Sequence, residues 1–175
     1  KFMILKYYDP LSSARDNLMN SVKAIRYAIK MKADIINYSG GGDEKSLMEE
    51  QAILDAQGQG VLFVAAAGNE GRNTDDRGYY PAGYKLNNLI SVAATDYQEH
   101  LLPTSNFGKS SVHTAAPGKD IYSSLPSGKF GYMTGTSQAT AWISGELAKF
   151  ILDNNLQGSA AYVREKFLEE RNTTT

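Results

Sequence analysis

Residues 61–66, Val-Leu-Phe-Val-Ala-Ala, decide the fold of this chain, because they form the most continuous apolar run in it. A run without polar alternation is typical of a strand that is buried on both faces, and such strands occupy the middle of parallel sheets. We therefore predict a central parallel strand at this position.

Helical and extended segments alternate on both sides of this strand. Upstream, the spacing of the apolar residues predicts an amphipathic helix over about 15–31, and a short buried strand over 33–38 follows it. A second helix is expected over 45–59, where Gly58 and Gly60 end it. This order of strands and helices predicts an α/β fold with a parallel sheet.

Downstream, the pattern continues with a strand over 89–94 and then a segment rich in Gly, Ser and Pro. Two short strands, 121–124 and 130–134, are expected to form a hairpin. The last two elements are expected to be helices over 137–153 and 160–170. We see one domain and no internal repeat.

The first residues, 1–8, are expected to form a core strand, because they are mostly apolar and have no polar lead-in. The sequence also opens with Lys1 and not with Met, which suggests a start within a longer protein. On this interpretation, residues 1–175 are an incomplete domain.

Composition excludes several classes of function. The 175 residues are 42% hydrophobic and 21% charged, with a formal net charge of -1 and no basic cluster, so neither nucleic acid nor a membrane surface is an expected partner. The absence of cysteine rules out disulfides, thiol catalysis and cysteine-based metal sites. No apolar run approaches the roughly 20 residues of a membrane-spanning helix.

The sharpest chemical signal is residues 135–141, Gly-Thr-Ser-Gln-Ala-Thr-Ala, which lead from a strand directly into a helix. Ser137 is expected at the helix N-terminus, where free backbone amides and the positive end of the dipole favour a developing negative charge. The alternative is that Thr136 or Ser137 only caps the helix.

Two further segments follow predicted strands. In residues 65–71, Ala-Ala-Ala-Gly-Asn-Glu-Gly, the side-chain amide of Asn69 could donate a hydrogen bond to an oxyanion, or the turn could simply favour Asn and Gly. After the strand at 33–38, Ser39, Gly40 and Gly41 expose backbone that could pair with an extended peptide, or they could form an ordinary turn.

The order and spacing of these three segments resemble those of the subtilisin-like serine peptidases, the subtilases. Tyr-Pro-Ala at 80–82, Ile-Ser-Val-Ala-Ala at 90–94 and Ala-Ala-Pro-Gly at 115–118 also resemble that family. The resemblance implies a three-layer α/β/α fold with a mostly parallel sheet, of which the N-terminal part is missing. It also implies a hydrolase that acts on peptide or protein substrates.

The resemblance further implies roles for individual residues. Ser137 would be the nucleophile, and the Asn69 side chain together with the Ser137 backbone amide would bind the oxyanion. The residues of one cleft wall would pair with the substrate backbone: Ser39, Gly40 and Gly41. The residues of the opposite wall would line the primary specificity pocket: Ala65, Ala66, Ala67 and Gly68. Glu70 would lie near the mouth of this pocket, and small wall residues suggest that it admits a large side chain.

The chain departs from the family where catalysis needs a base. The family carries Asp and His upstream of the nucleophile, but neither His100 nor His113 matches the catalytic segment, and both are interpreted as surface or packing residues. This chain alone is therefore expected to be nearly inert, with its Asp and His supplied by a missing N-terminal part. Gln138, Ala141 and Trp142 replace the usual Met, Pro and His of the family.

Three hypotheses follow. The first is a serine endopeptidase, the second a catalytically silent subtilase-like domain that binds peptides or acts as a scaffold, and the third an unrelated α/β ligand-binding domain. The third ranks last, because no Gly-x-Gly-x-x-Gly turn opens a helix. No cofactor is expected, except that Asp75 and Asp76 could bind calcium by analogy with the family. The family is mostly secreted, so an extracellular location is expected.

Overall fold

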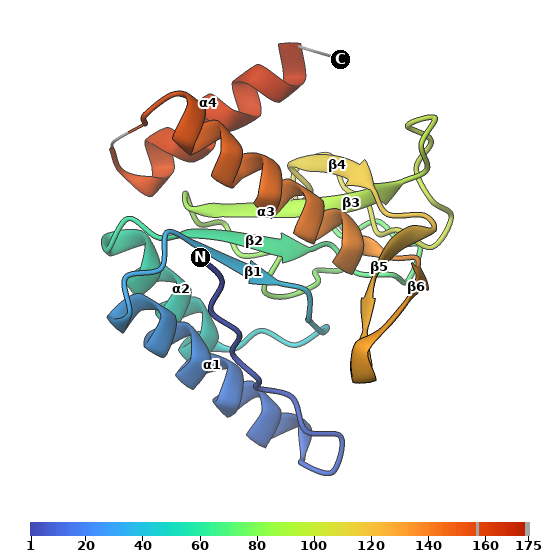
Figure 1. Cartoon of the computed structure of the whole chain (residues 1–175). Coiled ribbons are helices and arrows are strands. Elements are labelled where there is room, and N and C mark those ends of the chain that lie inside the picture. Colours follow the sequence, from blue (N-terminus) through green and yellow to red (C-terminus); the bar gives the residue numbers. More distant parts are fainter. Residues whose placement is uncertain (157, 174–175) are drawn as a thin grey trace.

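The computed structural model describes residues 1–156 and 158–173 and is built on a parallel sheet (Figure 1). The sheet has 4 strands in the order β1-β2-β3-β4, and these are Ile35–Tyr38, Leu62–Ala66, Leu89–Thr95 and Thr114–Pro117. All residues of β2 and β3 are buried. The prediction that residues 61–66 form a central parallel strand is confirmed.

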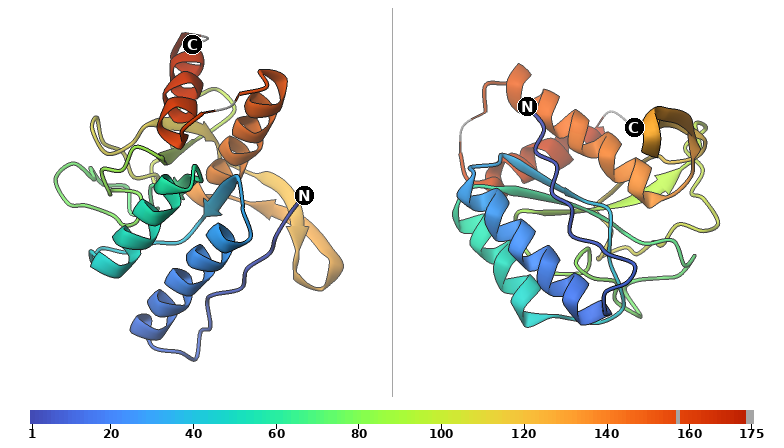
Figure 2. Two further views of the ribbon diagram at one scale, coloured as in Figure 1. Left: turned by 90° about the vertical axis from the view of Figure 1, so that its left-hand side faces the viewer. Right: turned by 60° about the horizontal axis from the view of Figure 1, so that its bottom comes forward.

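Helices cover both faces of the sheet and give three layers (Figure 2). Helices α1 (Ala14–Lys30) and α2 (Leu47–Gly58) lie on one face, and α3 (Thr136–Asp153) and α4 (Ala160–Thr173) lie on the other. Alternate residues of β2 face opposite layers: Phe63 packs in the cluster with α1 and α2, and Val64 packs in the cluster with α3 and α4. The predicted α/β/α fold is therefore observed.

The expected hairpin is also present. Strands β5 (Ile121–Leu125) and β6 (Lys129–Met133) pair antiparallel, and the short turn η1 (Pro126–Gly128) connects them. The hairpin leads from the end of β4 to the start of α3, so it positions the segment that carries Ser137 (Figure 1).

The prediction of a core strand over residues 1–8 is wrong. These residues belong to no strand, and the side chains of Phe2 and Ile4 are 100% and 87% exposed. A strand requires a neighbour for its backbone, and no such pairing forms here among the described residues. The segment is held in part by the Tyr7 ring, which stacks on Tyr38 with a centroid separation of 5.4 Å.

No helix within residues 1–156 and 158–173 has both the length and the apolar character needed to cross a membrane.

Candidate active site

Three loops meet at the carboxyl edge of the sheet, which is where ligands bind in open α/β sheets. Strands β1 and β2 point toward the end at which α3 begins (Figure 1). Ser39 follows β1, Asn69 lies just beyond β2, and Ser137 is the second residue of α3. The fold therefore brings together the three segments that the sequence singled out.

The first turn of α3 leaves a backbone donor free at Ser137. Gly135 precedes the helix with φ 156° and offers no side-chain cap. Within the part of the chain that the structure describes, the Ser137 backbone N–H has no hydrogen-bond partner. This donor stands at the positive end of the helix dipole, where an anion is stabilised.

Ser137 and Ser39 make reciprocal hydrogen bonds. The Ser137 hydroxyl donates to the Ser39 carbonyl at 3.1 Å, and the Ser39 hydroxyl donates to the Ser137 carbonyl at 3.2 Å. The loop after β1 is thereby attached to the start of α3. Because Ser137 is only partly buried, its hydroxyl remains accessible to a ligand.

The side-chain amide of Asn69 is oriented by Thr136. Its Oδ1 accepts from the Thr136 backbone N–H at 2.9 Å and from the Thr136 hydroxyl at 3.1 Å. A backbone N–H can only donate, so the oxygen of the amide must face Thr136 and the NH2 group must point away. In the described residues nothing accepts a hydrogen bond from the Asn69 Nδ2. Asn69 and the Ser137 amide therefore provide two donors that are unpaired among the described residues, and Asn69 is bonded to the residue that directly precedes Ser137.

The two sides of the substrate cleft that the sequence predicted differ in their exposure to solvent. Ala65, Ala66 and Ala67 are 0%, 3% and 1% exposed and pack into the sheet, and Gly68 is also buried. On the other side Gly41 is exposed, and the backbone groups of Gly40 and Gly41 make no hydrogen bond within the described chain. The Tyr7 side chain lies over Gly40, where an added Cβ would be 3.4 Å from the Tyr7 Cζ.

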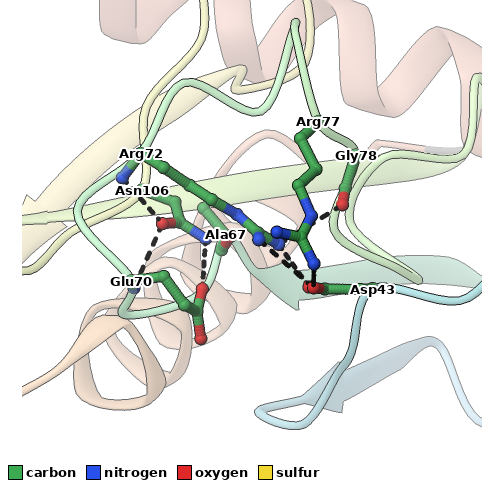
Figure 3. Close-up of polar contacts among 7 residues, drawn as sticks. All are labelled: Asp43, Ala67, Glu70, Arg72, Arg77, Gly78 and Asn106. Carbon is green, nitrogen blue, oxygen red and sulfur yellow. Dashed lines mark hydrogen bonds and ion pairs between the residues drawn. The ribbon is translucent and has the colours of Figure 1, made fainter.

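Asn106, which sequence reasoning missed, holds the loop after β2 (Figure 3). Its Oδ1 accepts from the backbone N–H groups of Glu70 and Arg72, both at 3.1 Å. Its Nδ2 donates to the Ala67 carbonyl at 2.8 Å and to the Glu70 carboxylate at 2.6 Å. The Glu70 carboxylate is thus folded back over Gly68. No pattern in the sequence marks Asn106, because its partners lie more than thirty positions away.

A second set of contacts joins the loops after β1 and β2. Asp43 forms ion pairs with both Arg72 and Arg77 (Figure 3). The hydrogen bond from Arg72 is the main reason that the pKa of Asp43 lies below its usual value, and the charge of Arg77 acts in the same direction. This pairing was also missed, because charged residues in separate polar loops give no signal of their partners.

Neither histidine contacts Ser137. His100 is exposed and lies 3.4 Å from the Asp96 carboxylate, whereas His113 is partly buried and its Nδ1 accepts from the Ser91 backbone N–H at 2.9 Å. Burial is the first cause that lowers the pKa of His113, to about 4, and the charge of Arg164 adds to it. The described residues therefore hold no base next to the Ser137 hydroxyl.

The two acidic residues considered for calcium have other contacts. The Asp75 carboxylate accepts from the backbone N–H groups of Ser110 and Ser111, and the Asp76 carboxylate accepts from the Asn73 side chain. Among residues 1–156 and 158–173, no three His, Cys, Asp or Glu side chains cluster in a way that could hold a metal ion.

Comparison with known proteins identifies the class. The chain belongs to the subtilase family, whose sequence model matches residues 5–170. Over 130 residues it is 41% identical to the major intracellular serine protease of Bacillus subtilis (strain 168), covering 73% of this chain and 40% of that protein. Over 121 residues it is 39% identical to thermitase of Thermoactinomyces vulgaris, covering 69% of this chain and 41% of that protein.

Solved structures show the same fold. The structure of the prenylagaramide maturation protease PagA matches with a TM-score of 0.76 and 28% identity, covering 92% of this chain and 58% of that one. The self-cleaved protease domain of PatA matches with a TM-score of 0.74 and 32% identity, covering 84% of this chain and 57% of that one. The predicted subtilisin-like fold is thus confirmed.

The chain spans only about 40% of the length of curated relatives such as the Bacillus subtilis protease. That relative and a similar protease of Paenibacillus polymyxa are both named as intracellular, which gives no support to the expected secretion.

Proposed function

We propose that this chain carries the nucleophile and the oxyanion donors of a serine endopeptidase. The Ser137 hydroxyl gives its proton to the general base and attacks a peptide carbonyl, the C–N bond breaks as the protonated amine fragment leaves, and water then hydrolyses the acyl-enzyme. The Asn69 side chain and the Ser137 backbone amide stabilise the charge that develops on the carbonyl oxygen. The observation that carries this proposal is the orientation of Asn69, whose amide oxygen is held by Thr136 so that its NH2 group has no acceptor among the residues that the structure describes.

The substrate is an extended peptide or protein segment. The unpaired backbone groups of Gly40 and Gly41 are suited to pair with a substrate strand, because main-chain hydrogen bonds supply affinity without depending on its sequence. Ala65, Ala66, Ala67 and Gly68 form the opposite side, and Glu70 stands at the rim. No nucleic acid, membrane or cofactor has a part in this reaction.

The general base and its orienting acid come from outside these residues. Neither His100 nor His113 contacts Ser137, so we propose that a His and an Asp from an N-terminal part of the same catalytic domain complete the site. A serine hydroxyl without a base is a weak nucleophile. This chain alone is therefore expected to hydrolyse peptides at most very slowly.

The finding that neither His100 nor His113 contacts Ser137 also supports one alternative function. If the upstream part contains no His and Asp, the chain belongs to a catalytically silent subtilase-like protein that binds peptides or acts as a scaffold. The backbone of Gly40 and Gly41 would still pair with a peptide, but Ser137 would not be acylated.

Fluorophosphonate labelling of the full-length protein distinguishes the two functions. We expect the probe to modify Ser137, as mapped by mass spectrometry of the labelled peptide, and we expect no labelling of a Ser137→Ala variant. Ser144→Ala is a matched control, because Ser144 is a partly buried serine of the same helix whose hydroxyl contacts the Asn37 side chain and the Thr140 carbonyl. A folded full-length protein that resists the probe would instead support the silent alternative.

A further inference from the structure

Tyr79 fills the space between the two loops of the candidate site. A Cβ atom added at Gly41 would lie 2.8 Å from the Tyr79 Cζ, and one added at Gly68 would lie 3.0 Å from the same atom. Separations of this size are shorter than or at the limit of what real Cβ atoms show. The glycines therefore admit the tyrosine ring, which lies against the loop after β1 and the loop after β2 at once.

The backbone on either side of the ring is fixed. Tyr80 and Gly42 exchange two backbone hydrogen bonds, at 2.7 Å and 2.8 Å, and the Tyr79 carbonyl accepts from the Gly83 N–H at 2.7 Å. The Arg72 guanidinium, which pairs with Asp43, also lies 3.5 Å from the Gly78 carbonyl (Figure 3). Only rotation about the side-chain bonds could move the ring, and its partly buried position restricts that rotation.

Glu70 narrows the same space from the rim. Its Oε2 would be 2.6 Å from a Cβ at Gly68, and the bond from Asn106 keeps it there. Burial and then the charge of Glu70 raise the pKa of Tyr79 to about 12, which agrees with a ring enclosed beside a carboxylate. A substrate side chain that enters between Gly41 and Gly68 meets an uncharged ring and an acidic group.

We propose that Tyr79 is a specificity-determining residue, which restricts the substrate residue before the cleaved bond to small side chains such as Gly, Ala and Ser. This inference rests on the proposed peptidase function and narrows its substrate class. It replaces the expectation, drawn from the small residues of the wall alone, that the pocket admits a large side chain. The Tyr79 ring takes the volume that Gly41 and Gly68 leave.

The test uses the full-length protein and a series of peptide anilides that differ only in the residue before the cleaved bond, which is Ala, Leu or Phe. The wild-type protein should cleave the Ala peptide with a kcat/KM at least about tenfold above that of the Phe peptide. A single methylene in a pocket already changes kcat/KM by about tenfold or more. Tyr79→Gly should reverse the preference. Tyr79→Phe should keep it, because the ring and not the hydroxyl fills the space.

Tyr97→Gly is the matched control, because Tyr97 is 61% exposed on a separate loop and should leave the preference unchanged. Wild-type protein that cleaves the Phe peptide as well as the Ala peptide overturns the inference, even if Tyr79→Gly fails to fold. Fluorophosphonate labelling of Ser137 is measured on the same samples. Protein that is labelled but cleaves the Phe peptide as well as the Ala peptide refutes only the role of Tyr79. Protein that is neither labelled nor active refutes the peptidase function and the inference with it.

Discussion

Ser39 and Ser137 each donate a side-chain hydrogen bond to the other's backbone carbonyl, at 3.2 Å and 3.1 Å. The pair joins the end of β1 to the start of α3, although the two residues are far apart in the sequence. The Ser137 hydroxyl donates to a backbone oxygen, so its orientation does not depend on the Ser39 side chain. The Ser39 hydroxyl, by contrast, acts on the position of the helix start and also accepts from the Asn37 side chain at 3.1 Å.

Ser39→Ala should therefore weaken catalysis only modestly. It removes the exposed hydrogen bond to the Ser137 carbonyl, of about 1 kcal/mol, together with an exposed one from the Asn37 side chain, and leaves the acceptor of the Ser137 hydroxyl in place. We expect the rate of fluorophosphonate labelling at Ser137 to fall by less than about tenfold, since 1.4 kcal/mol corresponds to a factor of ten. A loss as large as that of Ser137→Ala would show that Ser39 has a direct catalytic role.

Asn69→Ala should have a much larger effect. Removing the corresponding side-chain donor in subtilisin costs about 100- to 1000-fold in kcat, and we expect a loss of that order here. KM should change little, because the donor acts on charge that develops in the transition state. Steady-state kinetics of the full-length protein with a peptide anilide measure both quantities.

Thr136→Val provides a graded comparison with Asn69→Ala. It removes the hydroxyl that orients Asn69 but keeps the backbone N–H donor and the side-chain volume. We expect kcat to fall by about tenfold, the effect of one lost hydrogen bond that positions another group. If Thr136→Val were as damaging as Asn69→Ala, the backbone contact alone would not be enough to orient the amide.

Stability should depend on pH through His113. Its pKa is lowered from 6.5 to about 4 in the folded protein, so between these values the unfolded chain binds a proton that the folded chain does not. The stabilisation is therefore complete above pH 6.5 and decreases as the pH falls toward 4. The full effect is on the order of 3 kcal/mol, at about 1.4 kcal/mol for each pH unit between 6.5 and 4.

His113→Asn tests this assignment, because the Asn side chain can still accept from the Ser91 N–H but does not titrate. Urea unfolding of the full-length protein at pH 7 and pH 5 should show a smaller difference for this variant than for the wild type. His100→Asn, at an exposed histidine, is the control and should leave the difference unchanged. Equal pH dependence in His113→Asn and wild type would contradict the prediction.

Asp43→Asn should loosen the two loops that surround Tyr79. The contribution of Asp43 is present above its ordinary pKa of 3.8 and is lost as the pH falls through its lowered value, because protonation removes the charge that pairs with Arg72. Thermal unfolding should therefore show a lower midpoint for the variant at neutral pH, and the difference should shrink in acid. Asp153→Asn is the matched control, because the ion pair between Asp153 and Lys149 is exposed and such pairs contribute little to the free energy of unfolding.

Local patterns predicted most of the fold. The unbroken apolar run of β2 and the amphipathic spacing of α1 are properties of contiguous residues, so they could be interpreted without knowledge of the rest of the chain. The segment 1–8 shows the limit of this reasoning. Its apolar residues fit a strand, but a strand also needs a paired neighbour, and none pairs with it among the described residues.

For the site, the sequence by itself determined which groups are present: a serine at the start of a helix, an asparagine after a buried strand, and glycines after another. Only the tertiary structure decided how they act. Thr136 sets which end of the Asn69 amide is free, and Tyr79 fills the space that Gly41 and Gly68 leave. The physical reason is that hydrogen-bond direction and free volume are relations between distant segments, and these exist only after the chain has folded.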